Sequence, residues 1–200
     1  MWTDSDIQLM LSFKNGDQRA FQQLFDKYKK RVINYCYRYC GHRPVAEDLS
    51  QEIFIRVYKA APSYRPKARF STWLFKIATN VCLNEIRKPV YRTKLESIDQ
   101  TPDERNPASR EIAIEPAQSM PDILLETHQH QAQVQQAMAK LPEQQRAALL
   151  LRTTEEFSYR EIGRQINCSE KRVKTLIHRG RKRMKKILGA YWGKNEQESM

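Results

Sequence analysis

The chain has 200 residues, enough for one medium domain or two small ones, and its mean hydropathy of -0.75 indicates extensive polar surface. Lys and Arg number 35 against 23 Asp and Glu, a formal net charge of +12 that favours a polyanionic partner, nucleic acid first of all. A ribosomal or membrane-surface protein has a similar balance, so the placement of the charge has to decide. No stretch approaches the roughly 18 apolar residues of a membrane span, and no secretion signal is visible, so we expect a cytoplasmic protein without a membrane span.

The first part of the chain predicts two long helices that pack together. A turn at Asn15-Gly16-Asp17 precedes apolar residues spaced by three and four as far as Gly41, which is typical of an amphipathic helix. Pro44 opens the second helix and Pro62 ends it. Its buried side is expected to hold Leu49, Ile53, Phe54 and Val57.

A basic loop and a third helix are expected next. Pro66 prevents residues 63–70 from continuing a helix. Ser71 or Thr72 is then expected to cap a third helix that runs to about Lys88.

The middle of the chain differs in composition from both flanks. Residues 94–126 contain four prolines and eight acidic residues against three basic ones, which indicates a flexible acidic linker. We therefore expect a helical domain at 1–93, the linker at 94–121, a second helical domain at 122–192 and a disordered tail at 193–200. No strand-like alternation appears, so the fold class is predicted to be all-α.

The second domain carries a helix-turn-helix pattern. Ser158-Tyr-Arg-Glu161 has the spacing of a capping box and predicts a short helix to Ile166, followed by a turn at Asn167-Cys168. Ser169 can cap a second helix, and residues 171–190 contain nine basic residues and no acidic one. A short helix, a tight turn and a basic helix form the arrangement that enters the DNA major groove. The alternative is an ordinary solvated basic face.

The residues expected to meet bases or phosphates of duplex DNA share the basic face of this helix. Arg and Lys donate to guanine edges and also neutralise phosphates. His178 by itself is more often an ordinary surface residue. The predicted contacts are Lys171, Arg172, Lys174, Thr175, His178, Arg179, Arg181 and Lys182.

Basic and aromatic residues are interleaved near the third helix. Residues 65–94 contain eight Lys or Arg and a single Glu, with four aromatic residues between them. Cations that hold a phosphate backbone and rings that stack on bases are suited to single-stranded DNA. Alternatively, Phe70 and Trp73 are core aromatics, which leaves Tyr64 and its loop as better contact candidates.

Several motifs together resemble the extracytoplasmic-function sigma factors, a subfamily of bacterial transcription initiation factors. Gly16-Asp-Gln-Arg-Ala-Phe21, Glu47-Asp-Leu-Ser-Gln-Glu52, Thr72-Trp-Leu and Ile77-Ala-Thr-Asn80 are similar to that family's region 2. Leu141-Pro-Glu-Gln-Gln-Arg146 and residues 158–188 are similar to its region 4. The resemblance covers nearly the whole chain outside the linker. It implies a region 2 helical bundle and a region 4 helix-turn-helix.

The resemblance also implies partners. Asp48, Gln51, Glu52 and Arg56 would dock on the β′ clamp of core RNA polymerase, with the β flap as a second contact, although the same residues also fit ordinary surface charges. The basic helix would read the promoter element about 35 base pairs upstream of the start. An anti-sigma factor, one that holds the protein at the membrane in some cases, is the expected regulator. Lys174 and His178 depart from the family's usual residues, so promoter preference does not transfer.

The element about ten base pairs upstream would be read near the third helix, where a base is flipped out of the opening duplex. Asn80 is alternatively a plain polar residue of a helix face. The predicted contacts to this strand are Tyr64, Arg65, Lys67, Arg69, Phe75, Lys76, Asn80, Asn84 and Arg87.

Two rival interpretations remain from the sequence. One is a helix-turn-helix regulator without polymerase contact. The other is a metal sensor or enzyme, because Cys36, Cys40 and His42 have a spacing that two thiolates of one helix face can use. A fourth ligand is not evident, and no catalytic triad, Gly-rich phosphate loop or HExxH motif is present. We therefore expect no enzyme activity, no cofactor and no metal.

Overall fold

The computed structural model describes residues 4–88 and 121–198, with side chains described for 4–88 and 130–190. Every regular element in this part of the chain is helical, which confirms the all-α class. No helix in these ranges is long and apolar enough to cross a bilayer. The linker predicted at 94–121 lies almost wholly outside the described residues.

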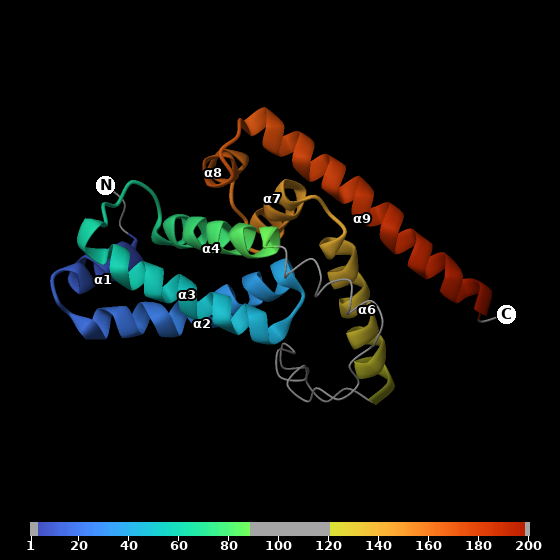
Figure 1. Ribbon diagram of the computed structural model, residues 1–200, viewed down its shortest axis with the longest axis horizontal. Coiled ribbons are helices and arrows are strands. Elements are labelled where there is room, and N and C mark those ends of the chain that lie inside the picture. The colour runs from blue at the N-terminus through green and yellow to red at the C-terminus, as the bar shows by residue number, and fades with distance from the viewer. Residues whose placement is uncertain (1–3, 89–120, 199–200) are drawn as a thin grey trace.

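The first two helices begin at aspartate caps. In α1 (Ser5–Lys14) the side chain of Asp4 accepts a hydrogen bond from the amide of Asp6, and in α2 (Gln18–Cys40) Asp17 accepts one from Arg19 at 2.9 Å. Gly41 ends α2 in the left-handed conformation, φ 78°, where a residue without a side chain is favoured. Helix α2 lies where the sequence pattern predicts a helix, whereas α1, which packs on it, was not predicted (Figure 1).

The next helices follow the prolines with one correction. Helix α3 (Arg43–Ala60) has Pro44 in its first turn, and a 3₁₀ turn (Ala61–Ser63) contains Pro62. Helix α4 (Phe70–Arg87) begins before Ser71, and the residue that precedes it, Arg69, makes no side-chain cap. The predicted cap at Ser71 or Thr72 is therefore wrong. The amide of Phe70 is instead bonded to the carboxylate of Asp4, 66 residues away.

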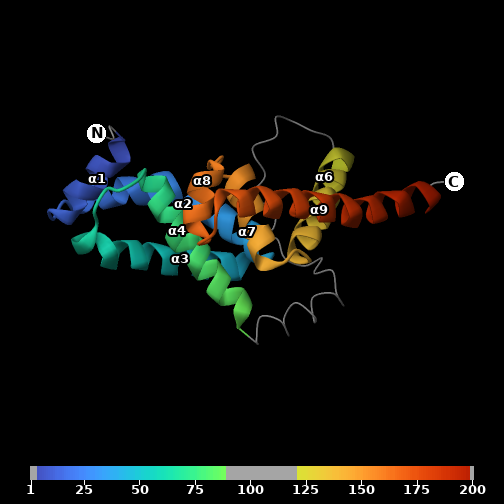
Figure 2. The ribbon, with the colours of Figure 1, turned by 90° about the horizontal axis from the view of Figure 1, so that it is seen from above.

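Residues 121–198 form four helices. These are α6 (Pro121–Ala139), α7 (Glu143–Thr153), α8 (Tyr159–Gln165) and α9 (Glu170–Glu198), the last extending well beyond the body of the molecule (Figures 1 and 2). Helix α9 continues through residues 193–198, which the sequence analysis assigned to a disordered tail. No proline interrupts it.

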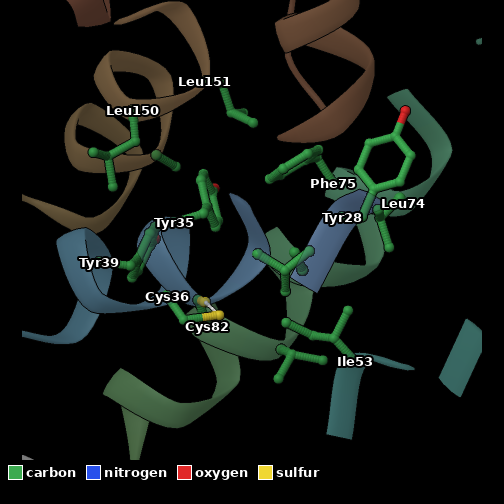
Figure 3. Close-up of a cluster of buried hydrophobic side chains, with 14 of the residues drawn as sticks. Tyr28, Tyr35, Cys36, Tyr39, Ile53, Leu74, Phe75, Cys82, Leu150 and Leu151 are labelled. Atoms are coloured by element: carbon green, nitrogen blue, oxygen red, sulfur yellow. Dashed lines mark hydrogen bonds between the residues drawn. The ribbon is translucent and has the colours of Figure 1, made fainter. Parts of the chain in front are cut away.

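The two helical groups share one hydrophobic core. Figure 3 shows Leu150 and Leu151 of α7 beside Tyr35 of α2 and Phe75 of α4, all of them buried. Arg146 of α7 is 5% exposed and donates to the backbone carbonyl of Tyr39 at 2.8 Å. The domains predicted from the sequence are therefore packed against each other, and the first turn of α4 contacts α8 through Thr72.

Candidate nucleic-acid interface

The capped helix α8 has the geometry that the sequence predicted. The Ser158 hydroxyl accepts a hydrogen bond from the amide of Glu161 at 3.3 Å, and the Glu161 carboxylate accepts one from the amide of Ser158 at 2.9 Å. This reciprocal pair satisfies two amides that the first turn otherwise leaves open. Burial acts to raise the pKa of Glu161, but the hydrogen bonds from Ser158 and Thr72 outweigh it, so this pKa lies below its ordinary value.

The turn after α8 holds α9 close to it. Asn167 adopts φ 52°, a conformation that asparagine tolerates better than most residues, and the amide of Cys168 donates to the carbonyl of Gly163 at 2.9 Å. The Ser169 hydroxyl accepts from the amide of Arg172 at 3.3 Å, as predicted for the cap of α9. The result is a helix-turn-helix.

The basic face of α9 is turned to solvent. Val173 and Ile177 are buried beneath it, and α9 approaches α7 closely at Gly180, where a Cβ would lie 2.7 Å from the Cδ1 atom of Leu149. A recess runs along this face and is lined by Ser169, Lys171, Arg172, Thr175, Leu176 and Arg179. All eight predicted duplex contacts, from Lys171 to Lys182, are exposed.

Few carboxylates neutralise this face. Lys174 reaches Glu170 only at 4.0 Å, and both side chains are more than half exposed, so the attraction is weak. Arg172 donates to the side-chain oxygen of Gln144 at 3.1 Å, a neutral partner that orients the guanidinium and leaves its charge intact. The surface can therefore attract phosphates and donate to base edges.

Around α4 the structure exposes seven of the nine predicted contacts. The exposed side chains are Arg65, Lys67, Arg69, Lys76, Asn80, Asn84 and Arg87. Arg87 is not isolated, since it donates to Glu143 of α7 at 2.8 Å. The exposed set offers cations and amides, the groups that hold a backbone and read base edges.

Tyr64 and Phe75 are not at the surface in this conformation. Tyr64 is 3% exposed and packs edge-on against Trp73, with 4.9 Å between the ring centroids. The sequence had favoured Tyr64 over Trp73 as a contact to DNA, and its burial corrects this prediction. Burial raises the pKa of Tyr64 to about 12. Phe75 is fully buried between Tyr35 and Phe157. Phe157 lies 82 residues further along the chain, a neighbour that no local pattern reveals.

The cysteines belong to the core. Cys82 donates to the sulfur of Cys36 at 3.8 Å, and Cys40 donates to the backbone oxygen of His42 at 3.4 Å. Burial raises the pKa of Cys40 to about 12, so it is held as a thiol and not as the thiolate that binds metals. Within the described residues, no group of three or more His, Cys, Asp or Glu is placed to hold a metal ion.

Comparison with known proteins assigns both halves of the chain. The family model for sigma-70 region 2 matches residues 24–89, and the model for sigma-70 region 4 matches residues 131–184. The chain is 35% identical to the ECF RNA polymerase sigma factor SigW of Bacillus subtilis, over 88% of this chain and 92% of that protein. It is 32% identical to the ECF RNA polymerase sigma-E factor of Escherichia coli, over 88% and 91%. The chain belongs to the extracytoplasmic-function sigma factors.

Solved structures of this fold agree. The structure of CnrH in complex with the cytosolic domain of CnrY matches with a TM-score of 0.65 and 20% identity, covering 94% of this chain and 99% of that one. The sigma factor RpoE of Bartonella quintana, in complex with the anti-sigma factor NepR, matches with a TM-score of 0.60 and 22% identity, over 84% and 96%. Membership of the sigma factor family, which the sequence matches show, makes this protein a transcription factor. All of α1 and the C-terminal part of α9 lie outside the two family matches.

One further surface of the sigma factor lies on α3. Asp48, Gln51 and Arg56 are exposed there, and Arg56 donates to Glu52 within the same helix at 3.0 Å. Ile55 lies among them and is 53% exposed. Sequence reasoning missed Ile55. The sequence does hold a signal for this residue, because the helical period places Ile55, an apolar residue, on the polar side of an amphipathic helix.

Proposed function

We propose that the protein binds core RNA polymerase and directs it to promoters by reading a −10 and a −35 element. The observation that carries this proposal is the presence, in one chain, of a capped helix-turn-helix and of a second, separate row of exposed cations and amides on α4. One surface suits a duplex and the other suits a single strand.

Helix α9 supplies the −35 contacts in this proposal. The exposed Lys171, Arg172 and Lys174 lie in its first turns, the part of a recognition helix that reaches base edges. Arg179, Arg181 and Lys182 follow further along and neutralise phosphates. Each phosphate contact releases counterions, so the affinity for duplex falls steeply with salt.

The loop before α4 and the exposed face of α4 supply the −10 contacts. Arg65, Lys67 and Arg69 hold the backbone, while Asn80 and Asn84 offer amides that both donate and accept. They lie four residues apart, so both face the same side of the helix. Phe75 takes part only if it separates from Phe157, and Tyr64 supports the loop from beneath.

The exposed face of α3 around Ile55 suits the polymerase. An apolar side chain ringed by Asp48, Gln51, Glu52 and Arg56 has the composition of a small docking site, apolar at the centre and polar at the rim. Its partner is the β′ clamp, with the β flap contacting region 4. The protein acts in the cytoplasm, and an anti-sigma factor releases it in response to an extracytoplasmic or stress signal.

Transcription with purified components tests the proposal. Core polymerase is incubated with the protein on genomic promoter fragments, and transcript start sites are mapped. We expect starts that depend on the protein, and a loss of at least tenfold with Ile55→Glu, because a charge replaces the apolar centre of the docking site. Lys30→Glu, an exposed charge reversal on α2 and therefore outside this surface of α3, is the matched control. Starts that are independent of the protein contradict the proposal.

A further inference from the structure

The loop proposed to hold the −10 strand, residues 64–69 and here named the −10 loop, has no regular structure of its own. It lies between the 3₁₀ turn that ends at Ser63 and the first residue of α4, and its cations Arg65, Lys67 and Arg69 are exposed. A loop that is flexible in the free protein has to be ordered when it binds a ligand, which weakens binding. Contacts from outside the loop therefore decide how well it is ordered before DNA arrives.

Helix α1 and its cap hold the −10 loop at both ends (Figure 1). At one end, the Lys14 ammonium donates to the backbone carbonyl of Tyr64 at 3.0 Å. At the other end, the Asp4 carboxylate accepts from the amide of Phe70 at 3.3 Å, while its second oxygen caps α1 by accepting from the amide of Asp6 at 3.1 Å. The two bonds join residues 50 and 66 positions apart in the chain. A charged group takes part in each bond, which makes it stronger than a bond between neutral groups.

Helix α1 is fixed in turn to the body of its domain. Asp6 is 4% exposed, and its carboxylate accepts from the hydroxyl of Tyr28 at 2.7 Å and from the ammonium of Lys27 at 2.5 Å, both on α2. Met10 is fully buried. The ring of Tyr28 also packs edge-on against Phe70, with 5.3 Å between the ring centroids. Helix α1 is therefore a rigid support for the loop and not a second flexible segment.

The start of the loop depends on Lys14 in particular. The buried hydroxyl of Tyr64 has no hydrogen-bond partner in the described part of the chain, so this side chain packs on Trp73 without fixing the loop by a polar contact. The backbone of Tyr64 supplies such a contact, through the bond from Lys14. Lys14 is exposed, so replacing it leaves the core intact.

We propose that Lys14 and Asp4 are positioning residues for reading the −10 strand. They clamp the −10 loop onto α1 and so present Arg65, Lys67 and Arg69 to the strand in one arrangement, without touching DNA themselves. Helix α1 precedes the residues that the region 2 model matches, so the family match assigns no role to it. The inference rests on the proposed function for its effect on the −10 strand, whereas the clamp itself is a property of the free protein.

Trypsin cleavage of the full-length free protein tests the clamp. Trypsin cuts after Lys67 and Arg69 but not after Arg65, because a proline follows it. Lys14→Met keeps the length of the side chain and removes the donor. We expect cleavage at the two loop sites to become about tenfold faster, the effect of losing one exposed hydrogen bond from a charged group. Lys14→Arg keeps a donor and should be cut like the wild type. Lys30→Met, the same change at an exposed position of α2, is the matched control.

Asp4→Ser separates the clamp from the cap of α1. Serine caps a helix about as well as aspartate does, but it has one side-chain oxygen where aspartate has two, so it serves the amide of α1 and not that of Phe70 as well. We expect unchanged helix content by circular dichroism, together with faster cleavage after Arg69. Asp17→Ser is the matched control, because Asp17 caps α2 and its carboxylate accepts only from amides of that helix.

The consequence for the promoter is measured with holoenzyme, formed from core polymerase and each full-length variant. The probe is a fluorescent single strand that carries the −10 element of a promoter mapped in the transcription experiment. We expect Lys14→Met to weaken its binding about tenfold, because a smaller fraction of the loops is ready to bind, and Lys14→Arg to restore it. The slope of log affinity against log salt should stay unchanged, since no phosphate contact is lost.

Unchanged cleavage after Lys67 and Arg69 in both Lys14→Met and Asp4→Ser overturns the clamp. Faster cleavage with unchanged binding of the −10 strand overturns the positioning role. A salt slope lowered by about one also overturns it, because Lys14 then holds a phosphate itself. A wild-type holoenzyme that binds no −10 strand contradicts only the proposed function, since the cleavage experiment needs no promoter and still decides the clamp.

Discussion

Replacing Gly163 by alanine tests how tightly the helix-turn-helix is packed. A Cβ at this position lies 2.6 Å from the carbonyl oxygen of Cys168, a backbone atom of the turn that cannot rotate away. Alanine is favoured over glycine within a helix by about 0.5–1 kcal/mol, while forcing a methyl group into filled space costs about 1–3 kcal/mol. We expect the free energy of unfolding to fall by about 1 kcal/mol, the difference between the central values of these two effects.

Gly189→Ala is the control for Gly163→Ala. Gly189 also lies within a helix, α9, but nothing stands within 4 Å of a Cβ there, so the helix preference acts alone and stabilises by about 0.5–1 kcal/mol. Urea denaturation followed by circular dichroism measures both, with the midpoint moving in opposite directions and the slope unchanged. If the two variants shift the midpoint in the same direction, the close packing of the turn against α8 is refuted.

Three other changes test the cap, the buried arginine and the buried carboxylate. Ser158→Ala removes the cap of α8 and should cost about 1 kcal/mol of unfolding free energy, seen as a lower thermal midpoint. Arg146 donates hydrogen bonds to three backbone carbonyls, and Arg146→Ala removes all three. This change should lower the unfolding free energy by about 3 kcal/mol or more, measured by urea denaturation. Burial raises the pKa of Glu155 to about 7, against the opposing charges of Arg31 and Arg38. The protonated form of Glu155 therefore stabilises the fold below about pH 4.5, and this stabilisation is lost as the pH rises through 7. The unfolding free energy of the wild type should fall between pH 5 and 8. In Glu155→Gln, which cannot ionise at this position, it should fall less.

Local signals predicted the helices wherever a cap or a proline fixed the end. Asp17 and Gly41 bound α2, and Ser158 with Glu161 starts α8, each through groups within a few residues. The start of α4 was mispredicted because its first amide is bonded to Asp4, across 66 residues. Serine is a residue type that often caps a helix, which is why Ser71 was predicted as the cap. The helix begins one residue earlier because the distant Asp4 accepts its first hydrogen bond.

The candidate sites, like the helix ends, were predicted where local signals suffice and mispredicted where a distant residue decides. Residues of the basic face of α9 were predicted correctly as exposed, because a helical period assigns faces without knowledge of the fold. Phe75 was predicted as a DNA contact, but its exposure depends on Phe157 in the other domain. Ile55 was missed for the opposite reason, since it lies 53% exposed and none of the described residues covers it. Periodicity predicts which side of a helix a residue occupies, and only the fold shows what lies on that side.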